Sequence, residues 1–211
     1  MNKKLRVLEL FKGTGSISKA LHKIIGNRVE VVSLDIDSKF QPTICTDIFD
    51  WKYKQAFPVG NFDFIHASPV CHHYSMGKRN VKDKSMQESN RIESDKMVQR
   101  VLDIIDYYKP TSWMLENPQT GELKNRDVVA GIPFADACYC RYGYAYAKKT
   151  RFWGSVNLVD QLKPVLKICC KSDHCQHSSI TNKGNLKHYY SIASGPSKGY
   201  RPMKEMWQMM R

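Results

Sequence analysis

The sequence predicts an α/β protein with a doubly wound, mostly parallel sheet. Short runs of β-forming residues alternate with stretches of helical apolar periodicity, and glycine or acidic residues follow the ends of several predicted strands. A chain of 211 residues can bury a substantial core without disulfides. Its hydrophobic fraction of 42% and charged fraction of 25% are ordinary for a globular protein, and they disfavour a disordered or fibrous class.

The first predicted strand covers residues 5–11 and leads into a glycine turn at 13–16. A helix is predicted over 17–25, where apolar residues recur at helical spacing, and it ends at Gly26. Strand, glycine turn and helix open a nucleotide-binding βαβ unit, because glycine lets the backbone turn tightly and approach a ligand. Alone, these glycines indicate either a cofactor site or a plain turn.

Two further predicted strands end in acidic residues. The strand over 29–34 leads to Asp35, where a carboxylate can accept hydrogen bonds from ribose hydroxyls. A short strand near 43–45 leads to Asp47, which can accept from an adenine amino group or cap the turn that follows. No Gly-Lys-Ser/Thr phosphate loop is present, which favours an adenosyl cofactor without phosphates over a nucleoside triphosphate.

A buried strand is predicted over 62–67, and Ser68-Pro69 ends it, so that Cys71 lies in a loop just past a strand end. Active-site residues of open α/β sheets commonly occupy such loops. His72 and His73 give the thiol an electropositive setting that favours a nucleophilic thiolate. The alternative is a buried cysteine that acts as a small hydrophobic side chain.

The polar stretch 77–90 lacks a core pattern and is predicted to be either disordered or a lid that closes over a nucleic-acid strand. A core-packing helix is predicted over 92–108. The next strand, over 112–115, is followed at its end by Glu116 and Asn117.

The formal net charge of +13 indicates a polyanionic partner, most simply nucleic acid, although solubility is an alternative reason for a basic chain. Seven cysteines and no apparent signal peptide favour reduced thiols in an intracellular, reducing compartment. No apolar run is long enough to span a bilayer, so we expect no membrane partner, and we expect a monomer.

The order and spacing of these motifs resemble the cytosine-5 DNA methyltransferase family. The matching positions are residues 11–15, Asp35, Asp47, 68–71 and 116–118, followed by a basic strand at 148–152. The resemblance covers about residues 5 to 155, and the small size is similar to compact members encoded by large DNA viruses and phages. It implies a Rossmann-like sheet of the S-adenosylmethionine-dependent methyltransferase type, with a small irregular C-terminal insertion.

The resemblance also implies the chemistry. Cys71 would add to carbon 6 of cytosine, which makes carbon 5 able to attack the methyl group of S-adenosylmethionine. Glu116 would hold or protonate ring nitrogen 3, Asn117 would order the loop, and Arg151 would contact the base carbonyl or an adjacent phosphate. Because carbon 5 is stacked inside a duplex, the base would have to flip out.

Further residues are assigned by the same resemblance and by charge. The cofactor-binding set is Phe11, Gly13, Thr14, Gly15, Ser16, Asp35, Ile36, Asp47, Ile48 and Pro69. The set expected near nucleic-acid phosphates is Lys78, Arg79, Lys82, Lys149, Lys183 and Lys187.

Val70 departs from the family, which usually has proline before the cysteine, so a less rigid turn and reduced activity are expected. Two alternatives to a DNA methyltransferase stay open. One is a cytosine-5 methyltransferase of RNA, as in the branch of the family that methylates tRNA. The other is a nucleic-acid-binding relative that has lost catalytic turnover.

The sequence divides into a catalytic domain over 1–160, a basic cysteine- and histidine-containing segment over 161–196 that serves as a reduced target-recognition region, and a C-terminal helix over 197–211. Zinc is a candidate metal, with Cys169, Cys170, Cys175 and His177 as candidate ligands, and a reduced cysteine-rich loop is the alternative. Cys138 and Cys140 are assigned to a different predicted strand.

Overall fold

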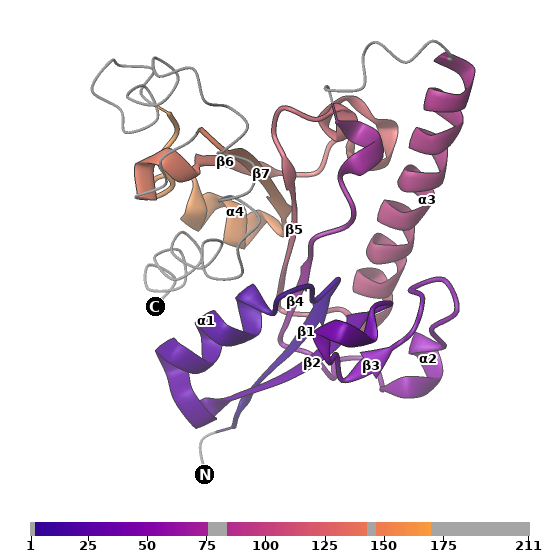
Figure 1. Ribbon diagram of the computed structural model, residues 1–211. Coiled ribbons are helices and arrows are strands. Elements are labelled where there is room, and N and C mark those ends of the chain that lie inside the picture. The colour runs from indigo at the N-terminus through magenta and orange to yellow at the C-terminus, as the bar shows by residue number, and fades with distance from the viewer. Residues whose placement is uncertain (1–2, 76–83, 143–146, 170–211) are drawn as a thin grey trace.

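The computed structural model describes residues 3–75, 84–142 and 147–169. Its centre is a seven-stranded sheet in the order β3-β2-β1-β4-β5-β7-β6 (Figure 1). The pairs from β3 to β5 are parallel, and β7 runs antiparallel to both of its neighbours. The predicted doubly wound, mostly parallel sheet is therefore confirmed. The strands are β1 (Leu5–Leu10), β2 (Val29–Asp35), β3 (Ile44–Cys45), β4 (Phe64–Ala67), β5 (Ser112–Pro118), β6 (Phe134–Cys138) and β7 (Lys149–Gly154).

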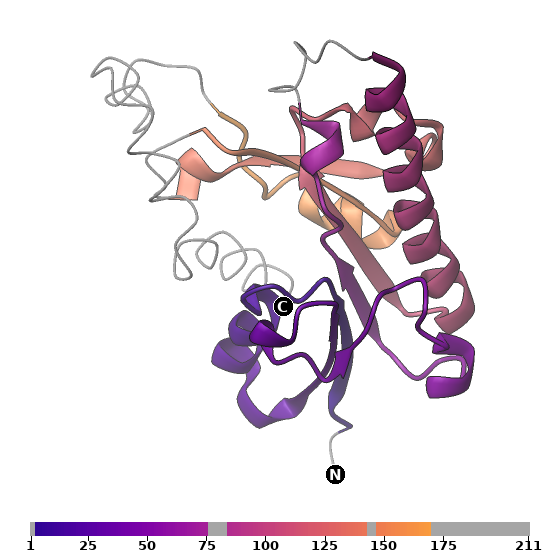
Figure 2. The same cartoon turned by 45° about the vertical axis from the view of Figure 1, so that its right-hand side comes forward.

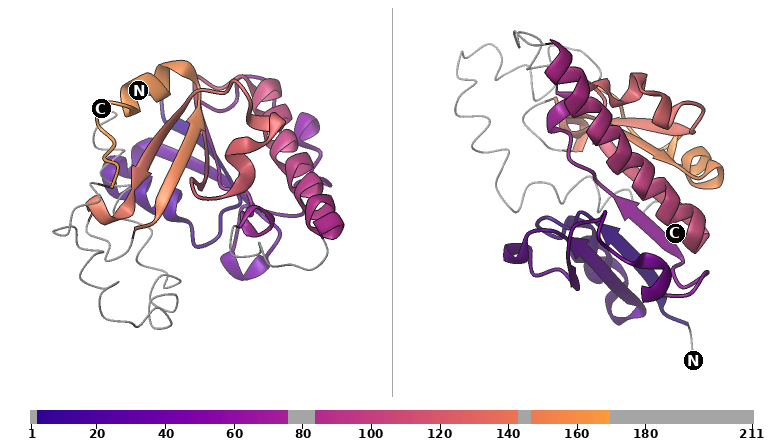
Figure 3. Two further views of the ribbon diagram at one scale, coloured as in Figure 1. Left: turned by 90° about the horizontal axis from the view of Figure 1, so that it is seen from above. Right: turned by 90° about the vertical axis from the view of Figure 1, so that its right-hand side faces the viewer.

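Helices cover both faces of the sheet, as Figures 2 and 3 show for α3 on one side and α1 on the other. The α-helices are α1 (Ser16–Ile25), α2 (Tyr53–Ala56), α3 (Lys84–Tyr108) and α4 (Val156–Leu162). Short 3-10 helices complete the connections: η1 (Gly26–Arg28), η2 (Ser38–Phe40), η3 (His72–Tyr74), η5 (Glu122–Asn125), η6 (Asp127–Val129) and η7 (Tyr139–Tyr142).

Alternation along the strands sends side chains into two separate cores, because successive residues of a strand point to opposite faces. Leu8, Ile65 and Leu115 pack against α3, whereas Val7, Phe64 and Met114 pack against α1 and α4. Burying a side chain of this size stabilises the fold by about 1.5–3 kcal/mol.

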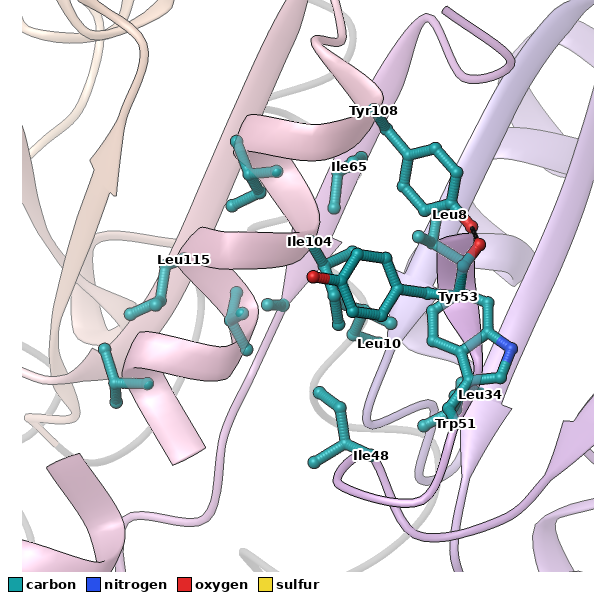
Figure 4. Close-up of a cluster of buried hydrophobic side chains, with 14 of the residues drawn as sticks. Leu8, Leu10, Leu34, Ile48, Trp51, Tyr53, Ile65, Ile104, Tyr108 and Leu115 are labelled. Atoms are coloured by element: carbon teal, nitrogen blue, oxygen red, sulfur yellow. Dashed lines mark hydrogen bonds between the residues drawn. The ribbon is translucent and has the colours of Figure 1, made fainter. Parts of the chain in front are cut away.

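Trp51, Tyr53 and Tyr108 form an aromatic cluster in the core on the α3 side of the sheet, as shown in Figure 4. The Tyr108 hydroxyl donates to the backbone carbonyl of Tyr53 at 2.6 Å, and Trp51 packs beside both rings. The buried hydroxyl therefore has the acceptor that a buried phenol requires.

Two sequence predictions are corrected by the structure. The polar stretch 84–90 is not a loop but the first part of the 25-residue helix α3. Its polar face is anchored by an ion pair from Arg126 to Glu88, so an apolar stripe is not needed there. Strand β5 also extends past residue 115 and includes Glu116 and Asn117, because β7 pairs with it at those positions.

Helix α4, which the sequence analysis does not anticipate, buries Leu158, Val159 and Leu162 against the sheet. The predicted helix over 197–211 and most of the segment 161–196 lie outside the described residues, so these domain boundaries stay predictions. Within the described ranges, no helix has both the length and the apolar character needed to cross a membrane.

Candidate active site

The glycine turn after β1 is tied to the end of β2 by a carboxylate. Phe11, Gly13 and Gly15 adopt positive φ angles of 59°, 49° and 71°. The backbone N–H of Gly13 donates to Asp35 Oδ2 at 2.7 Å, and that of Asp37 donates to Asp35 Oδ1 at 2.9 Å. Asp35 therefore shapes the turn through both of its oxygens, and each oxygen keeps a further lone pair for a ligand.

A second carboxylate, that of Glu9 on β1, contacts the backbone just after the glycine turn. Its side chain is buried on β1, and its Oε1 accepts a hydrogen bond from the backbone N–H of Ile17 in the first turn of α1 at 3.2 Å. Burial raises the pKa of Glu9 to about 7, although hydrogen bonds from Ser18 and Ile17 oppose the shift.

The predicted cofactor residues fall into two groups. An open space adjoins Gly13, the hydroxyl oxygens of Thr14 and Ser16 lie 3.4 Å apart at the turn, and Ile36 is 68% exposed at the end of β2. Ile48, in contrast, is a core residue that is 3% exposed. Asp47 accepts from the backbone N–H of Phe49 at 2.8 Å, which is the capping contact that the sequence left as an alternative to adenine binding.

The loop that carries Cys71 is fixed at its start by contacts to β1 and β5. The Ser68 hydroxyl donates to the carbonyl of Phe11 at 3.3 Å. Asn117 is completely buried, and its Nδ2 donates to the carbonyl of Pro69 at 3.0 Å. The hydrogen bond from Asn117 on β5 therefore restrains the turn before Cys71. It supplies part of the rigidity that a proline at position 70 would give.

The end of the same loop is fixed by a charged cluster. The Tyr74 hydroxyl donates to Asp95 on α3 at 2.8 Å, and Arg126 donates to Asp95 and Glu88, each at 2.6 Å. Burial and the nearby Asp95 carboxylate raise the pKa of Tyr74 well above its usual range, so this hydroxyl stays a donor. The residues between 69 and 74 therefore lie between two fixed points.

Cys71 is accessible to solvent, so the alternative of a buried hydrophobic cysteine is wrong, and two charged neighbours act on its thiol. Partial burial raises the pKa of the Cys71 thiol, the negative charge of Glu116 raises it further, and the positive charge of Lys148 lowers it. The parallel pairing of β4 and β5 brings the ends of these strands to one edge of the sheet, where the Cys71 loop is hydrogen-bonded to β5 beside Glu116.

Glu116 presents a carboxylate oxygen toward this place. In the described part of the chain, its buried Oε1 has no hydrogen-bond partner, and the nearest cation is Lys148, with Nζ at 4.0 Å. A buried oxygen without a hydrogen-bond donor lowers the stability of the folded protein unless a ligand donates to it. The site is therefore suited to a ligand with a donor or a protonatable nitrogen.

Arg151 occupies a different position from the one expected near the base. It forms a bidentate ion pair with Asp136 on β6, with two N–H to O distances of 2.8 Å, and its guanidinium lies over the ring of Phe134 at 3.5 Å. Alternation along β7 places Arg151 on the same face as Trp153, whereas Glu116 shares the opposite face with Met114. In this conformation, the basic residue beside Glu116 is Lys148.

Several predicted site residues lie outside the described part of the chain. They are Lys78, Arg79, Lys82, Lys183 and Lys187 of the expected phosphate contacts, and Cys170, Cys175 and His177 of the expected metal ligands. Lys149 is described, half-buried at the start of β7. Cys169 is described too, and the structure brings it next to Cys138 and Cys140, which the sequence had placed apart.

The chain is 28% identical to the probable DNA (cytosine-5)-methyltransferase of Frog virus 3 (isolate Goorha) over 199 residues, which cover 90% of this chain and 87% of that relative. Among solved structures, the Entamoeba histolytica methyltransferase EhMeth matches with a TM-score of 0.53 and the S. pombe Dnmt2 methyltransferase with 0.50, both at 17% identity. No family model matches the chain.

The match to EhMeth covers 74% of this chain and that to Dnmt2 covers 82%, but the chain spans only 54% and 58% of their lengths. The fold is that of the S-adenosylmethionine-dependent methyltransferases. The resemblance to the cytosine-5 DNA methyltransferase family is confirmed, and the relative that carries it is viral.

Sequence reasoning missed Lys148, Glu9 and the pair Asp95–Arg126. A signal existed for Lys148, which belongs to the basic motif, but only the register of β7 against β5 shows that it lies beside Glu116. Asp95 and Arg126 are separated by 31 residues, and no local pattern connects them.

Proposed function

We propose that this protein transfers a methyl group from S-adenosylmethionine to carbon 5 of cytosine in DNA through a covalent adduct with Cys71. One observation supports this most directly: β4 and β5 pair in parallel, so that Cys71 and Glu116 lie near the ends of neighbouring strands, and Asn117 next to Glu116 holds the Cys71 loop through the carbonyl of Pro69 at 3.0 Å. A thiol beside a carboxyl is the pair that addition to a pyrimidine ring requires.

The residues at the β1 and β2 ends are suited to S-adenosylmethionine. The space beside Gly13 is open, Asp35 can accept from ribose hydroxyls, and the exposed Ile36 offers an apolar surface to an adenine ring. When bound, S-adenosylmethionine supplies an electrophilic methyl group. The turn does not contain the Gly-Lys-Ser/Thr sequence of a phosphate loop, in keeping with a ligand without phosphates.

Cys71 and Glu116 carry out the other steps of the reaction. The Cys71 sulfur adds to carbon 6 of the base, and Glu116 donates a proton or a hydrogen bond at nitrogen 3 to stabilise the electron-rich ring. A protonated Glu116 no longer carries the negative charge that raises the pKa of Cys71. Protonation of Glu116 therefore favours the thiolate form of Cys71, and the Cys71 thiolate in turn favours protonated Glu116. A solvent molecule then takes the proton from carbon 5, the electrons of that C–H bond form the double bond to carbon 6, and the C–S bond breaks to release the Cys71 thiolate.

The test offers labelled S-adenosylmethionine with duplex DNA, single-stranded DNA and tRNA in separate reactions, followed by nucleoside analysis. We expect 5-methylcytosine in DNA, and none when Cys71→Ser replaces the wild type. The variant should still bind S-adenosylmethionine by calorimetry, because a hydroxyl keeps the size of the thiol but is a far weaker nucleophile.

A mechanism-based substrate sharpens the test. In DNA that carries 5-fluorocytosine, the fluorine cannot leave as a proton would, so the adduct should remain on the protein and map to Cys71 by peptide mass spectrometry. Methylation without this adduct would contradict the mechanism. Methylation of tRNA alone would favour the RNA-directed alternative, and no reaction on any substrate would favour a binding protein without turnover.

A further inference from the structure

Three cysteines converge where the edge strand β6 ends. Cys138 ends the edge strand β6, Cys140 lies in η7, and Cys169 follows α4. The sulfur atoms of Cys138 and Cys140 are 3.2 Å apart, and all three sulfur atoms lie within 4.8 Å of one another. The first two side chains are buried, at 1% and 5% exposure, and Cys169 is partly buried.

Backbone hydrogen bonds hold this convergence in place. The N–H of Cys138 donates to the carbonyl of Lys167 at 2.9 Å, and the N–H of Lys167 donates to the Tyr142 hydroxyl at 2.9 Å. The N–H of Tyr139 donates to the carbonyl of Lys148 at 3.0 Å. These hydrogen bonds join the segments around Cys138, Lys148 and Lys167, so the chain positions of the three cysteines are held close together.

The spacing of the sulfur atoms suits a tetrahedral metal ion. With Zn–S bonds of about 2.3 Å, ligating sulfur atoms in a tetrahedron lie roughly 3.8 Å apart. The sulfur atoms of Cys138 and Cys140 are 3.2 Å apart and none of the three separations exceeds 4.8 Å, a range that includes this value. None of the three cysteines is in a disulfide, and an odd number of neighbouring thiols could not be satisfied by one disulfide. Thiolates are the ligands that zinc prefers at closed structural sites.

We propose that Cys138, Cys140 and Cys169 bind a structural zinc ion that joins the edge of the sheet to the chain that follows α4. Binding would displace the thiol protons, and its free energy would add to the stability of the folded state. A tetrahedral site of this kind takes one ligand in addition to the three thiolates. The proposal concerns only the three thiolates that the structure places together, and it does not depend on the methyltransferase chemistry.

The test measures metal content in the full-length protein purified under reducing conditions with zinc in the growth medium. Elemental analysis and native mass spectrometry should give on the order of one zinc ion per chain. Cys138→Ser and Cys169→Ser should each lose most of that zinc. Cys45→Ser is the matched control, since Cys45 is an exposed cysteine on β3 outside the cluster, and it should keep the metal.

Two further measurements keep the test decisive if Cys138→Ser fails to fold. Cobalt substituted into the wild type should show thiolate charge-transfer absorption, and the band should weaken in the partly exposed Cys169→Ser. A strong zinc chelator should lower the melting temperature of the wild type, and added zinc should restore it. A metal-free wild type, a Cys138–Cys140 disulfide in the reduced preparation, or zinc retained in both serine variants would each overturn the proposal.

Discussion

At Cys71, charges of opposite sign compete to set the reactivity of the thiol. Burial raises its pKa most, Glu116 raises it further and Lys148 lowers it. The thiol form of Cys71 therefore predominates at neutral pH. Loss of the Glu116 charge would remove one of the two influences that raise the pKa, and burial would remain.

Removing the charge of Glu116 should make Cys71 more reactive toward a neutral alkylating agent. We expect Glu116→Gln to speed alkylation of Cys71 at neutral pH by roughly two- to tenfold, which corresponds to about 0.4–1.4 kcal/mol. Lys148→Met should slow the reaction, because it removes the cation that lowers the pKa. Peptide mass spectrometry would follow the reaction, with the exposed Cys45 as internal reference. Equal rates in all three proteins would show that these charges do not act on Cys71.

Glu9 gives the stability of the fold a pH dependence. Its pKa is about 7 in the folded protein and near 4.5 when unfolded, so the folded state keeps the proton longer. The associated stability is complete below pH 4.5 and is lost as the pH rises to about 7. Glu9→Gln should remove this loss, which amounts to about 1–3 kcal/mol of the free energy of unfolding.

Urea unfolding at several pH values in this window would measure the effect of Glu9→Gln. Glu30→Gln, which replaces an exposed carboxylate on β2, is the control and should leave the slope unchanged. Burial lowers the pKa of His66 to about 3, so the stability contributed by neutral His66 is lost as the pH falls from 6.5 toward 3. The contribution of His66 is the same in the wild type, Glu9→Gln and Glu30→Gln, so it cancels when their pH slopes are compared. An unchanged slope in Glu9→Gln would show that Glu9 titrates normally.

Among the elements, the contact from β5 to the Cys71 loop links the fold to the chemistry. Asn117→Ala should lower the free energy of unfolding by about 1–3 kcal/mol, because it removes a buried hydrogen bond and leaves the Pro69 carbonyl without its partner. The methyl-transfer rate should fall while the affinity for S-adenosylmethionine stays nearly constant.

A second substitution separates loop restraint from general stability. Val70→Pro added to Asn117→Ala should recover part of the transfer rate, since proline restricts the turn from within. Single-turnover kinetics of the single and double variants would measure this recovery. If the double variant stays as slow as Asn117→Ala, the hydrogen bond does more than hold the loop.

The elements that the sequence predicts are those with a local pattern. Strand β1, helix α1 and strand β2 follow from periodicity and glycine punctuation, and the loop position of Cys71 follows from Ser68-Pro69. The extension of β5 depends on its pairing with β7, and the ion pair of Arg151 depends on β6. The first turns of α3 depend on Arg126, which lies far along the chain. Such long-range partners leave no periodic trace in a single sequence.

For the whole molecule, the net charge of +13 predicts strongly salt-dependent binding to DNA. Each phosphate neutralised should contribute a slope of about −0.9 to a plot of log affinity against log salt. Lys149→Gln, at the carboxyl edge of the sheet, should reduce the magnitude of the slope by about one such unit. Lys4→Gln, ahead of β1 at the opposite edge, should leave it unchanged. Fluorescence anisotropy over a salt series would measure both slopes, and a flat dependence would mean that the charge serves solubility.

The two anchors of the Cys71 loop have a consequence for the kinetics of substrate capture. Asn117 holds Pro69 and Asp95 holds Tyr74, so the entropy of ordering the intervening residues is already lost when the protein folds. An incoming cytosine then meets a thiol that does not have to be immobilised first, and the slow event left is the departure of the base from its stack. Cytosines in mismatches, whose stacking is already weakened, should therefore be captured faster than those in perfect duplexes.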